Sequence, residues 1–335
     1  MLNKQYDLVA LYSGGLDSIL AVKLLTSQGL NILAVKFVTL FMSGKMQWRA
    51  TLERDDKLGC DILTIPVFRK YVHLVQNPKH GYGANINPCI DCKIYFLKRA
   101  GKIMKRVGAK GLVTGEVLGQ RPMSQNKQAL GIIEQESGSE GKILRPISAL
   151  LLNPTEMELS GLVNREKLLA IKGRSRKETI IWARELGITE FPSPAGGCLL
   201  TDPSVSKRIA DALKYGEKGL RELEALKYGR HFRLPGGTKL IVSRDDYESR
   251  YLTALLKKWI RIEPAYIAGL QSFISPYNLT DEDIALGCEI ALRYNARGSE
   301  NIKLSAKMIY PDNSEKIKLV LELKEKLDYA EYLVK

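Results

Sequence analysis

The sequence predicts an α/β protein with a parallel sheet in residues 1–203 and a smaller α+β domain in residues 204–335. Over the first two hundred residues, short apolar runs alternate with helical patterns, which is typical of parallel strands joined by crossover helices. Beyond about residue 204 the alternation stops, and helical patterns mix with hairpin-like apolar runs. The chain has 335 residues, of which 45% are hydrophobic, so it is long enough to bury two ordinary cores.

The elements of the first domain follow from these patterns. Short apolar runs predict strands at residues 6–12, 31–41, 60–67 and 111–117. Helical spacing of apolar residues predicts helices at 16–29, 46–59 and 178–187, and a further helix that begins near Cys92. A loop rich in Gly, Asn and Pro is expected at 77–90.

The second domain shows a different pattern. Helices are expected at 207–227, 245–258 and 280–295, and hairpin-like strands at 231–243 and 301–323. The chain contains no internal repeat and no low-complexity tract.

Charge is the unusual part of the composition. The chain carries 51 basic and 37 acidic residues, a net charge of +14, which favours a polyanionic partner such as nucleic acid. Residues 1–200 hold 28 basic and 17 acidic residues, so most of the excess lies there. No run of 18 apolar residues exists, which argues against a membrane span. The start lacks a signal-peptide pattern, and five cysteines make no disulfide scaffold, so a cytoplasmic protein is expected.

A basic helix concentrates this charge. Seven basic residues and no acidic residue lie between Cys92 and Gly115, and apolar residues recur there at helical spacing. Its outer face is expected to bind RNA through Lys98, Lys102 and Lys105. The alternative is an ordinary solvated face.

The segment Ser13-Gly14-Gly15-Leu16-Asp17-Ser18 lies between the first strand and the first helix. In open α/β sheets, ligands bind at this edge. Gly14 and Gly15 allow backbone amides to approach a phosphate, and the following helix N-terminus favours anions. Asp17 would repel a bare phosphate, which suggests a bridging Mg²⁺.

This segment resembles the PP-loop, SGGxDS, of the ATP pyrophosphatase group within the adenine-nucleotide α-hydrolase-like fold. The resemblance implies that ATP binds at Ser13, Gly14, Gly15, Asp17 and Ser18. It also implies that ATP adenylates a carbonyl oxygen, after which a nucleophile displaces AMP. The motif alone leaves the nucleophile open.

Further segments resemble those of sulfur-inserting enzymes and so indicate a sulfur nucleophile. Residues 87–93, NPCIDCK, and residues 195–198, AGGC, resemble the cysteine segments of tRNA 2-thiouridine synthetases, with Cys89 where these often carry Asp. Residues 114–120, TGEVLGQ, and residues 144–147, LRPI, resemble segments of tRNA 4-thiouridine synthetases. The order is that of sulfur-inserting PP-loop enzymes.

Three cysteines, Cys89, Cys92 and Cys198, are therefore expected to converge. Three thiolates can hold a [4Fe-4S] cluster and leave one iron open for sulfide, as the resemblance to cluster-dependent tRNA thiolases implies. Persulfide chemistry at Cys198 and a zinc or structural site are the alternatives. Together with Asp17 these cysteines are the expected catalytic residues, whereas Cys60 and Cys288 are expected to be buried structural residues.

Supporting residues follow from the same resemblance. It implies ATP contacts at Phe37, Lys93, Gly115 and Gln125. The basic segment at residues 172–177 is expected to contact RNA phosphates through Arg174 and Arg176, with a solvated loop as the alternative.

The C-terminal part resembles the RNA-binding domain of NFACT proteins, on the hairpin pattern of residues 230–242 with its Pro-Gly-Gly turn. The expected function is ATP-dependent tRNA thiolation, with sulfide or a sulfur-donor protein as a further partner, and a homodimer stays open. Sulfur insertion into a small cofactor precursor is the second hypothesis. A non-catalytic RNA-binding protein that uses its PP-loop as a nucleotide sensor is the third.

Overall fold

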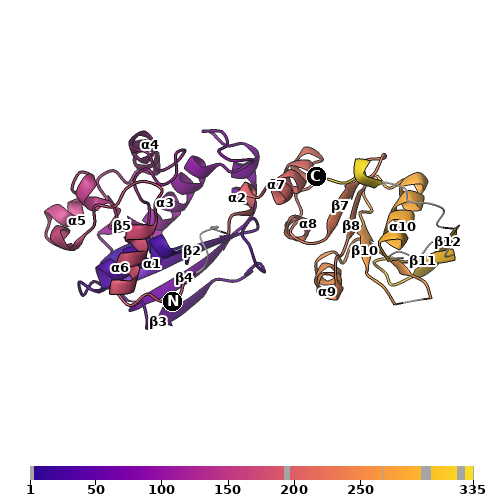
Figure 1. Ribbon diagram of the computed structural model, residues 1–335, viewed down its shortest axis with the longest axis horizontal. Helices are drawn as coiled ribbons and strands as arrows, with labels where there is room; N and C mark the ends of the chain where they lie inside the picture. Colours follow the sequence, from indigo (N-terminus) through magenta and orange to yellow (C-terminus); the bar gives the residue numbers. More distant parts are fainter. Residues whose placement is uncertain (1–3, 192–196, 267, 296–302, 323–328, 335) are drawn as a thin grey trace. The chain divides into compact units, whose positions relative to one another are not determined.

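The computed structural model describes residues 4–191, 197–266, 268–295, 303–322 and 329–334. It divides into two compact units, Met1–Cys198 and Leu199–Lys335 (Figure 1). None of the described helices is long and apolar enough to cross a membrane.

The first unit is built on a six-stranded sheet in the order β3-β4-β2-β1-β5-β6. All neighbouring strands are parallel except the edge pair of β3 and β4, so the α/β fold class is confirmed. The strands are β1 (Leu8–Leu11), β2 (Ile32–Thr39), β3 (Thr51–Asp55), β4 (Cys60–Val67), β5 (Gly111–Thr114) and β6 (Ile143–Leu144).

Helices connect these strands. The α-helices of the first unit are α1 (Leu16–Thr26), α2 (Arg69–Gln76), α3 (Cys89–Arg106), α4 (Lys127–Ser137), α5 (Glu156–Leu159) and α6 (Lys177–Glu185). Short 3₁₀ turns lie at η1 (Ala149–Leu151) and η2 (Arg165–Lys167). Helix α1 packs against α6, β2 and β5, whereas α3 packs against β1, β5 and α4.

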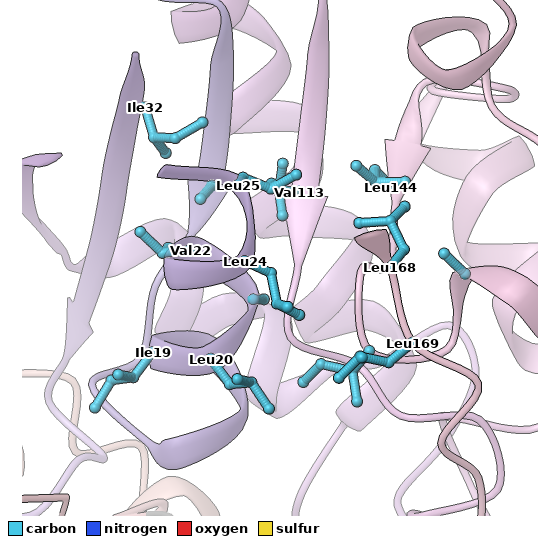
Figure 2. Packing of buried hydrophobic residues seen from close by; sticks show 14 of the residues in the cluster. Ile19, Leu20, Val22, Leu24, Leu25, Ile32, Val113, Leu144, Leu168 and Leu169 are labelled. Atoms are coloured by element: carbon cyan, nitrogen blue, oxygen red, sulfur yellow. The ribbon is translucent and has the colours of Figure 1, made fainter. Parts of the chain in front are cut away.

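Helix α1 anchors one hydrophobic core of this unit. Its leucines belong to one apolar cluster with residues of β5, β6 and the segment that follows η2, including Val113, Leu144 and Leu168 (Figure 2). Leu20 and Leu25 are fully buried, and each such side chain stabilises the fold by roughly 1.5–3 kcal/mol. This packing holds the start of α1 beside the carboxyl ends of the strands.

The sheet order creates a switch point at β1. The chain moves from β1 to β2 and β4 on one side, and then crosses to β5 and β6 on the other. In open α/β sheets, ligands bind at such a point, at the carboxyl ends of the strands.

The prediction of a helix at residues 46–59 is wrong. The structure has strand β3 there, paired antiparallel with β4, so that Thr51 lies opposite Thr64. A turn joins the two strands, in which the amide of Leu58 donates to the Asp55 carboxylate at 2.9 Å. The exposed charged residues of this segment fit a solvated edge strand as well as a helix, so the partner strand decides between them.

The second unit has a six-stranded antiparallel sheet in the order β12-β11-β9-β10-β8-β7. Its strands are β7 (Arg230–Arg233), β8 (Lys239–Val242), β9 (Ile260–Pro264), β10 (Ser272–Ile274), β11 (Lys303–Ile309) and β12 (Glu315–Glu322). Its helices are α7 (Pro203–Lys214), α8 (Leu220–Ala225), α9 (Asp246–Leu255) and α10 (Asp281–Asn295), with 3₁₀ turns at Leu199–Thr201 and Tyr329–Glu331. Helix α10 packs on one face of the sheet, and α8 and α9 cover apolar residues of the other face.

His231 on β7 lies inside this second unit. It is fully buried, and its Nε2 donates to the carbonyl of Tyr228 at 2.7 Å. Burial lowers the pKa of its imidazole well below the usual value, and the nearby cations Lys239, Arg208 and Arg244 lower it further. His231 is therefore a neutral packing residue.

Candidate active site

The loop after β1 forms a compact turn that leads into α1. Gly14 has a φ of 77°, in the left-handed region that glycine adopts without strain. The Ser18 hydroxyl donates to the carbonyl of Gly15 at 2.8 Å and lies 3.2 Å from the Ser13 hydroxyl. These internal hydrogen bonds hold the turn in shape and place the N-terminus of α1 directly after β1, which is a location that suits a phosphate.

Gly115, directly after β5, touches this turn. A Cβ atom at Gly115 would lie 2.6 Å from the backbone carbonyl of Asp17 and from the amide of Ser18. No side chain fits at that distance, so glycine is required for the two segments to meet. The loops that follow β1 and β5 therefore meet at the switch point.

A buried acid, Glu116, follows Gly115 and organises the ends of three elements. Its carboxylate accepts from the Thr114 hydroxyl at 3.0 Å and from Nε of Arg145 at 3.2 Å. It also lies 3.4 Å from Nζ of Lys93 on α3. Burial alone would raise the pKa of Glu116, but the positive charges of Lys93 and Arg145 lower it by more, so the pKa lies below the usual value. Arg145 additionally pairs with Glu134 of α4.

Gln125 lies close to the same segments. It is buried, its carbonyl accepts from the amide of Gly119 at 2.7 Å, and its side-chain Oε1 has no hydrogen-bond partner among the described residues. A buried polar atom without a partner is costly, and a bound ligand is one way to satisfy it.

Tyr71 of α2 lies next to one of the three expected cysteines. Cys89 and Cys92 lie one turn apart at the start of α3, and the Tyr71 hydroxyl is 3.1 Å from Sγ of Cys92. Cys198 pairs by a backbone bridge with Met42, just after β2. Burial raises the pKa of Tyr71, and negative charge on Cys92, Cys198 or Cys89 would raise it further.

The two helical cysteines are protonated thiols in this environment. Burial raises the pKa of Cys92 to about 12, against the lowering effect of its hydrogen bond with Tyr71. Burial also raises the pKa of Cys89, although the charges of Arg121 and Lys93 and a hydrogen bond with Ser124 oppose this. Binding to a metal would remove these protons.

The positions of these cysteines show whether they could hold a metal. Cysteine thiolates are the usual ligands of iron–sulfur clusters, and the sequence leads us to expect such a cluster on Cys89, Cys92 and Cys198. Among the residues that the structure describes, however, no group of three or more His, Cys, Asp or Glu side chains is in position to hold a metal ion. The expected segment Ala195–Gly196 before Cys198 lies outside the described residues.

Phe37, on β2, lies in an aromatic stack rather than at an open edge. Its ring stacks on Phe96 of α3 at 5.0 Å, and the guanidinium of Arg99 lies 5.8 Å from its centre. The ring of Phe96 in turn stacks on Tyr71 at 5.5 Å. The stack connects the second strand with the cysteine site.

The basic face of α3 extends away from this site. Lys98, Lys102 and Lys105 are exposed, as expected, and the helix begins at the thiols and ends near the start of β1. At 1.5 Å per residue, Lys105 lies about 24 Å along the axis from Cys89. Of the two arginines in segment 172–177, Arg174 is exposed and Arg176 pairs with Asp17.

Comparison with known proteins matches both units. Residues 3–151 match the family described as "Thiamine biosynthesis protein (ThiI)". Most of the N-terminal unit is therefore similar to that family. The chain is also 31% identical, over 155 residues, to a "Probable tRNA sulfurtransferase" of Thermococcus kodakarensis (strain ATCC BAA-918 / JCM 12380 / KOD1). That match covers 44% of this chain and 38% of the relative, so the chain spans about two fifths of the relative's length.

The C-terminal unit has its own match. Residues 229–332 match the family described as "NFACT protein RNA binding domain", in agreement with the resemblance seen in the sequence. A solved structure, the C-terminal part of the fibronectin/fibrinogen-binding protein from Streptococcus suis, is 14% identical. It matches over 48% of this chain and 78% of its own with a TM-score of 0.27, which is too low to support an argument.

Several residues of the candidate site are not evident from the sequence. Glu116 and Arg145 stand inside the TGEVLGQ and LRPI segments, but nothing in those segments indicates that the two side chains pair. Tyr71 and Arg121 belong to none of these motifs. The packing of α2 brings Tyr71 to Cys92, and the loop before α4 brings the charge of Arg121 near Cys89, so neither residue can be found from the sequence.

Proposed function

We propose that this protein is an ATP-dependent tRNA thiolation enzyme that converts a uridine into a thiouridine. The observation that carries the proposal is the common location of two sites. The turn at residues 13–18 follows β1, and the bridge between Met42 and Cys198 follows β2. Tyr71, whose hydroxyl lies 3.1 Å from Sγ of Cys92 in the first turn of α3, comes shortly after β4. A nucleotide and a sulfur nucleophile would therefore meet where ligands of open α/β sheets bind.

The proposed reaction has two steps. A uracil carbonyl oxygen attacks the α-phosphorus of ATP, and pyrophosphate leaves. Sulfide then bonds to the activated carbon, the carbon–oxygen bond breaks, and AMP leaves with the former carbonyl oxygen. The adenylated oxygen is a far better leaving group than the original carbonyl oxygen, which explains the use of ATP.

The residues of the chain bind and orient the reactants. The turn at residues 13–18 would hold the phosphates, and the Asp17 carboxylate would bind Mg²⁺. Glu116 pairs with Lys93, the residue that follows Cys92, and the charge of Lys93 would neutralise phosphate oxygens. A [4Fe-4S] cluster on Cys89, Cys92 and Cys198 would supply a metal site for the sulfide. The target base must leave its stack to reach this edge.

Nucleoside analysis tests the proposed substrate. Mass spectrometry of tRNA from a strain that lacks the gene should show the loss of one thiouridine. The wild-type gene should restore it, and a gene with Asp17→Asn should not. Unchanged tRNA would contradict the proposal and favour a small-molecule substrate or a non-catalytic nucleotide sensor.

Anaerobic purification tests the cluster. Iron analysis and an absorbance scan should show iron and a broad visible band, and Cys89→Ser should lose both. Cys288→Ser is the control, because Cys288 is buried in α10 of the other unit. A colourless, iron-free protein that still thiolates tRNA would exclude the cluster and favour persulfide chemistry.

A further inference from the structure

An ion pair joins the PP-loop turn to a segment far along the chain. Nη2 of Arg176 lies 3.2 Å from Oδ2 of Asp17, although 159 residues separate them. Both side chains are partly buried, with exposed fractions of 25% for Arg176 and 16% for Asp17. The other carboxylate oxygen of Asp17, Oδ1, is buried and has no hydrogen-bond partner among the described residues.

The backbone around Arg176 is fixed on two sides. Lys172 forms a parallel bridge with Leu118, and the amide of Gly173 donates to the carbonyl of Leu118 at 2.7 Å. Arg176 itself is the N-cap residue of α6, a helix that packs against α1. The guanidinium therefore reaches Asp17 from a well-anchored position and is not a loose surface group.

The chemistry of the turn explains why a cation is needed there. A carboxylate at the N-terminus of α1 occupies the place that favours phosphate, and two negative groups would repel each other. An arginine beside Asp17 offsets this repulsion and offers further donors to phosphate oxygens. Arg174, two residues earlier, is exposed, as an ordinary surface residue would be.

We propose that Arg176 is a positioning residue of the nucleotide site and not an RNA contact. It holds the Asp17 carboxylate in place, leaves Oδ1 available for a cation, and adds positive charge for the polyphosphate of ATP. This differs from the RNA-binding role expected from the sequence, and it rests on the proposed use of ATP at this turn.

Binding measurements on the full chain test the assignment. Calorimetric titration with ATP and Mg²⁺ should show that Arg176→Gln binds ATP roughly tenfold to a hundredfold more weakly, as expected when a hydrogen bond to a charged group is removed. Arg176→Lys should recover part of the affinity. The matched control, Arg174→Gln, should bind ATP as the wild type does.

The affinity for tRNA separates the two roles. Arg176→Gln should keep the wild-type tRNA affinity, measured by filter binding without ATP. The inference is overturned if Arg176→Gln binds ATP normally, or if it loses tRNA affinity while ATP affinity is intact. Circular dichroism identifies a variant that fails to fold, and Arg176→Lys then supplies the comparison.

A double-mutant cycle tests the positioning role without nucleotide. The stability changes of Asp17→Asn and Arg176→Gln should be non-additive in thermal unfolding, because each variant removes the same ion pair. Additive changes would show that the pair does not form in solution. The tRNA nucleoside analysis is independent of these measurements, so a wrong RNA substrate would leave the Arg176 result standing.

Discussion

At the residue scale, Gly115 leaves no room for a side chain beside the PP-loop turn. Replacing Gly115 with alanine would place a Cβ atom 2.6 Å from backbone atoms of Asp17 and Ser18, and neither backbone segment can move without disturbing the turn. We expect Gly115→Ala to weaken ATP binding at least about tenfold, because a small misplacement of binding groups is costly. Titration with ATP measures this.

A second glycine gives the matched control. Gly101 in α3 has open space where a Cβ would be added, so Gly101→Ala should leave ATP binding unchanged. It should also stabilise the chain by about 0.5–1 kcal/mol, because alanine is the better helix former. Equal ATP affinities for both variants would contradict the packing argument.

At the element scale, α3 combines two roles along its length. Its first turn carries the thiols, and its later turns present lysines to solvent. If tRNA lies along this helix, replacing Lys98, Lys102 and Lys105 with glutamine should weaken tRNA binding. The slope of log affinity against log salt should also become shallower, by about 0.9 for each phosphate that the helix no longer neutralises.

The control for this element lies in the other unit. Replacing Arg250, Lys257 and Lys258, which are exposed on and after α9, removes the same charge from the C-terminal unit. Because residues 1–200 hold most of the excess charge, this triple variant should change the salt slope less. ATP affinity should survive in both. Unchanged tRNA affinity of the α3 variant would mean that its face is only solvated.

The elements also show where periodicity was sufficient. Helix α1 was expected because its apolar residues repeat at helical spacing and Gly29 follows them; Gly29 has a φ of 85°, as a helix terminator should. Strand β3 was missed, since its residues pair only with a neighbouring strand and carry no alternation of their own.

At the scale of the whole molecule, each unit has its own hydrophobic core. One cluster surrounds α1, and two others lie on the faces of the antiparallel sheet. We expect calorimetry to show two unfolding transitions, one for each unit. ATP should raise the midpoint temperature of the N-terminal unit only, because a ligand stabilises the unit that binds it. A single transition that shifts as a whole would contradict this.

Lowering the pH should destabilise the C-terminal unit and lower the temperature at which it unfolds. The folded-state pKa of His231 is lowered, so below about pH 6.5 the unfolded chain binds a proton that the folded unit does not. The free energy of unfolding should then fall by up to about 1.4 kcal/mol per pH unit from this group. His231→Gln, which keeps a donor for Tyr228, should reduce this dependence. An unchanged pH profile would exclude the effect.

The sequence by itself determined the α/β class, the PP-loop turn, the basic face of α3 and the likeness of both units to known families. These features depend on residues close together in the chain, where periodicity and motif spacing are visible. Only the tertiary structure decided that Glu116 holds Lys93, that Tyr71 faces the thiols and that Arg176 pairs with Asp17. Such contacts join segments up to 159 residues apart, and they arise from the sheet order and helix packing that bring the segments together.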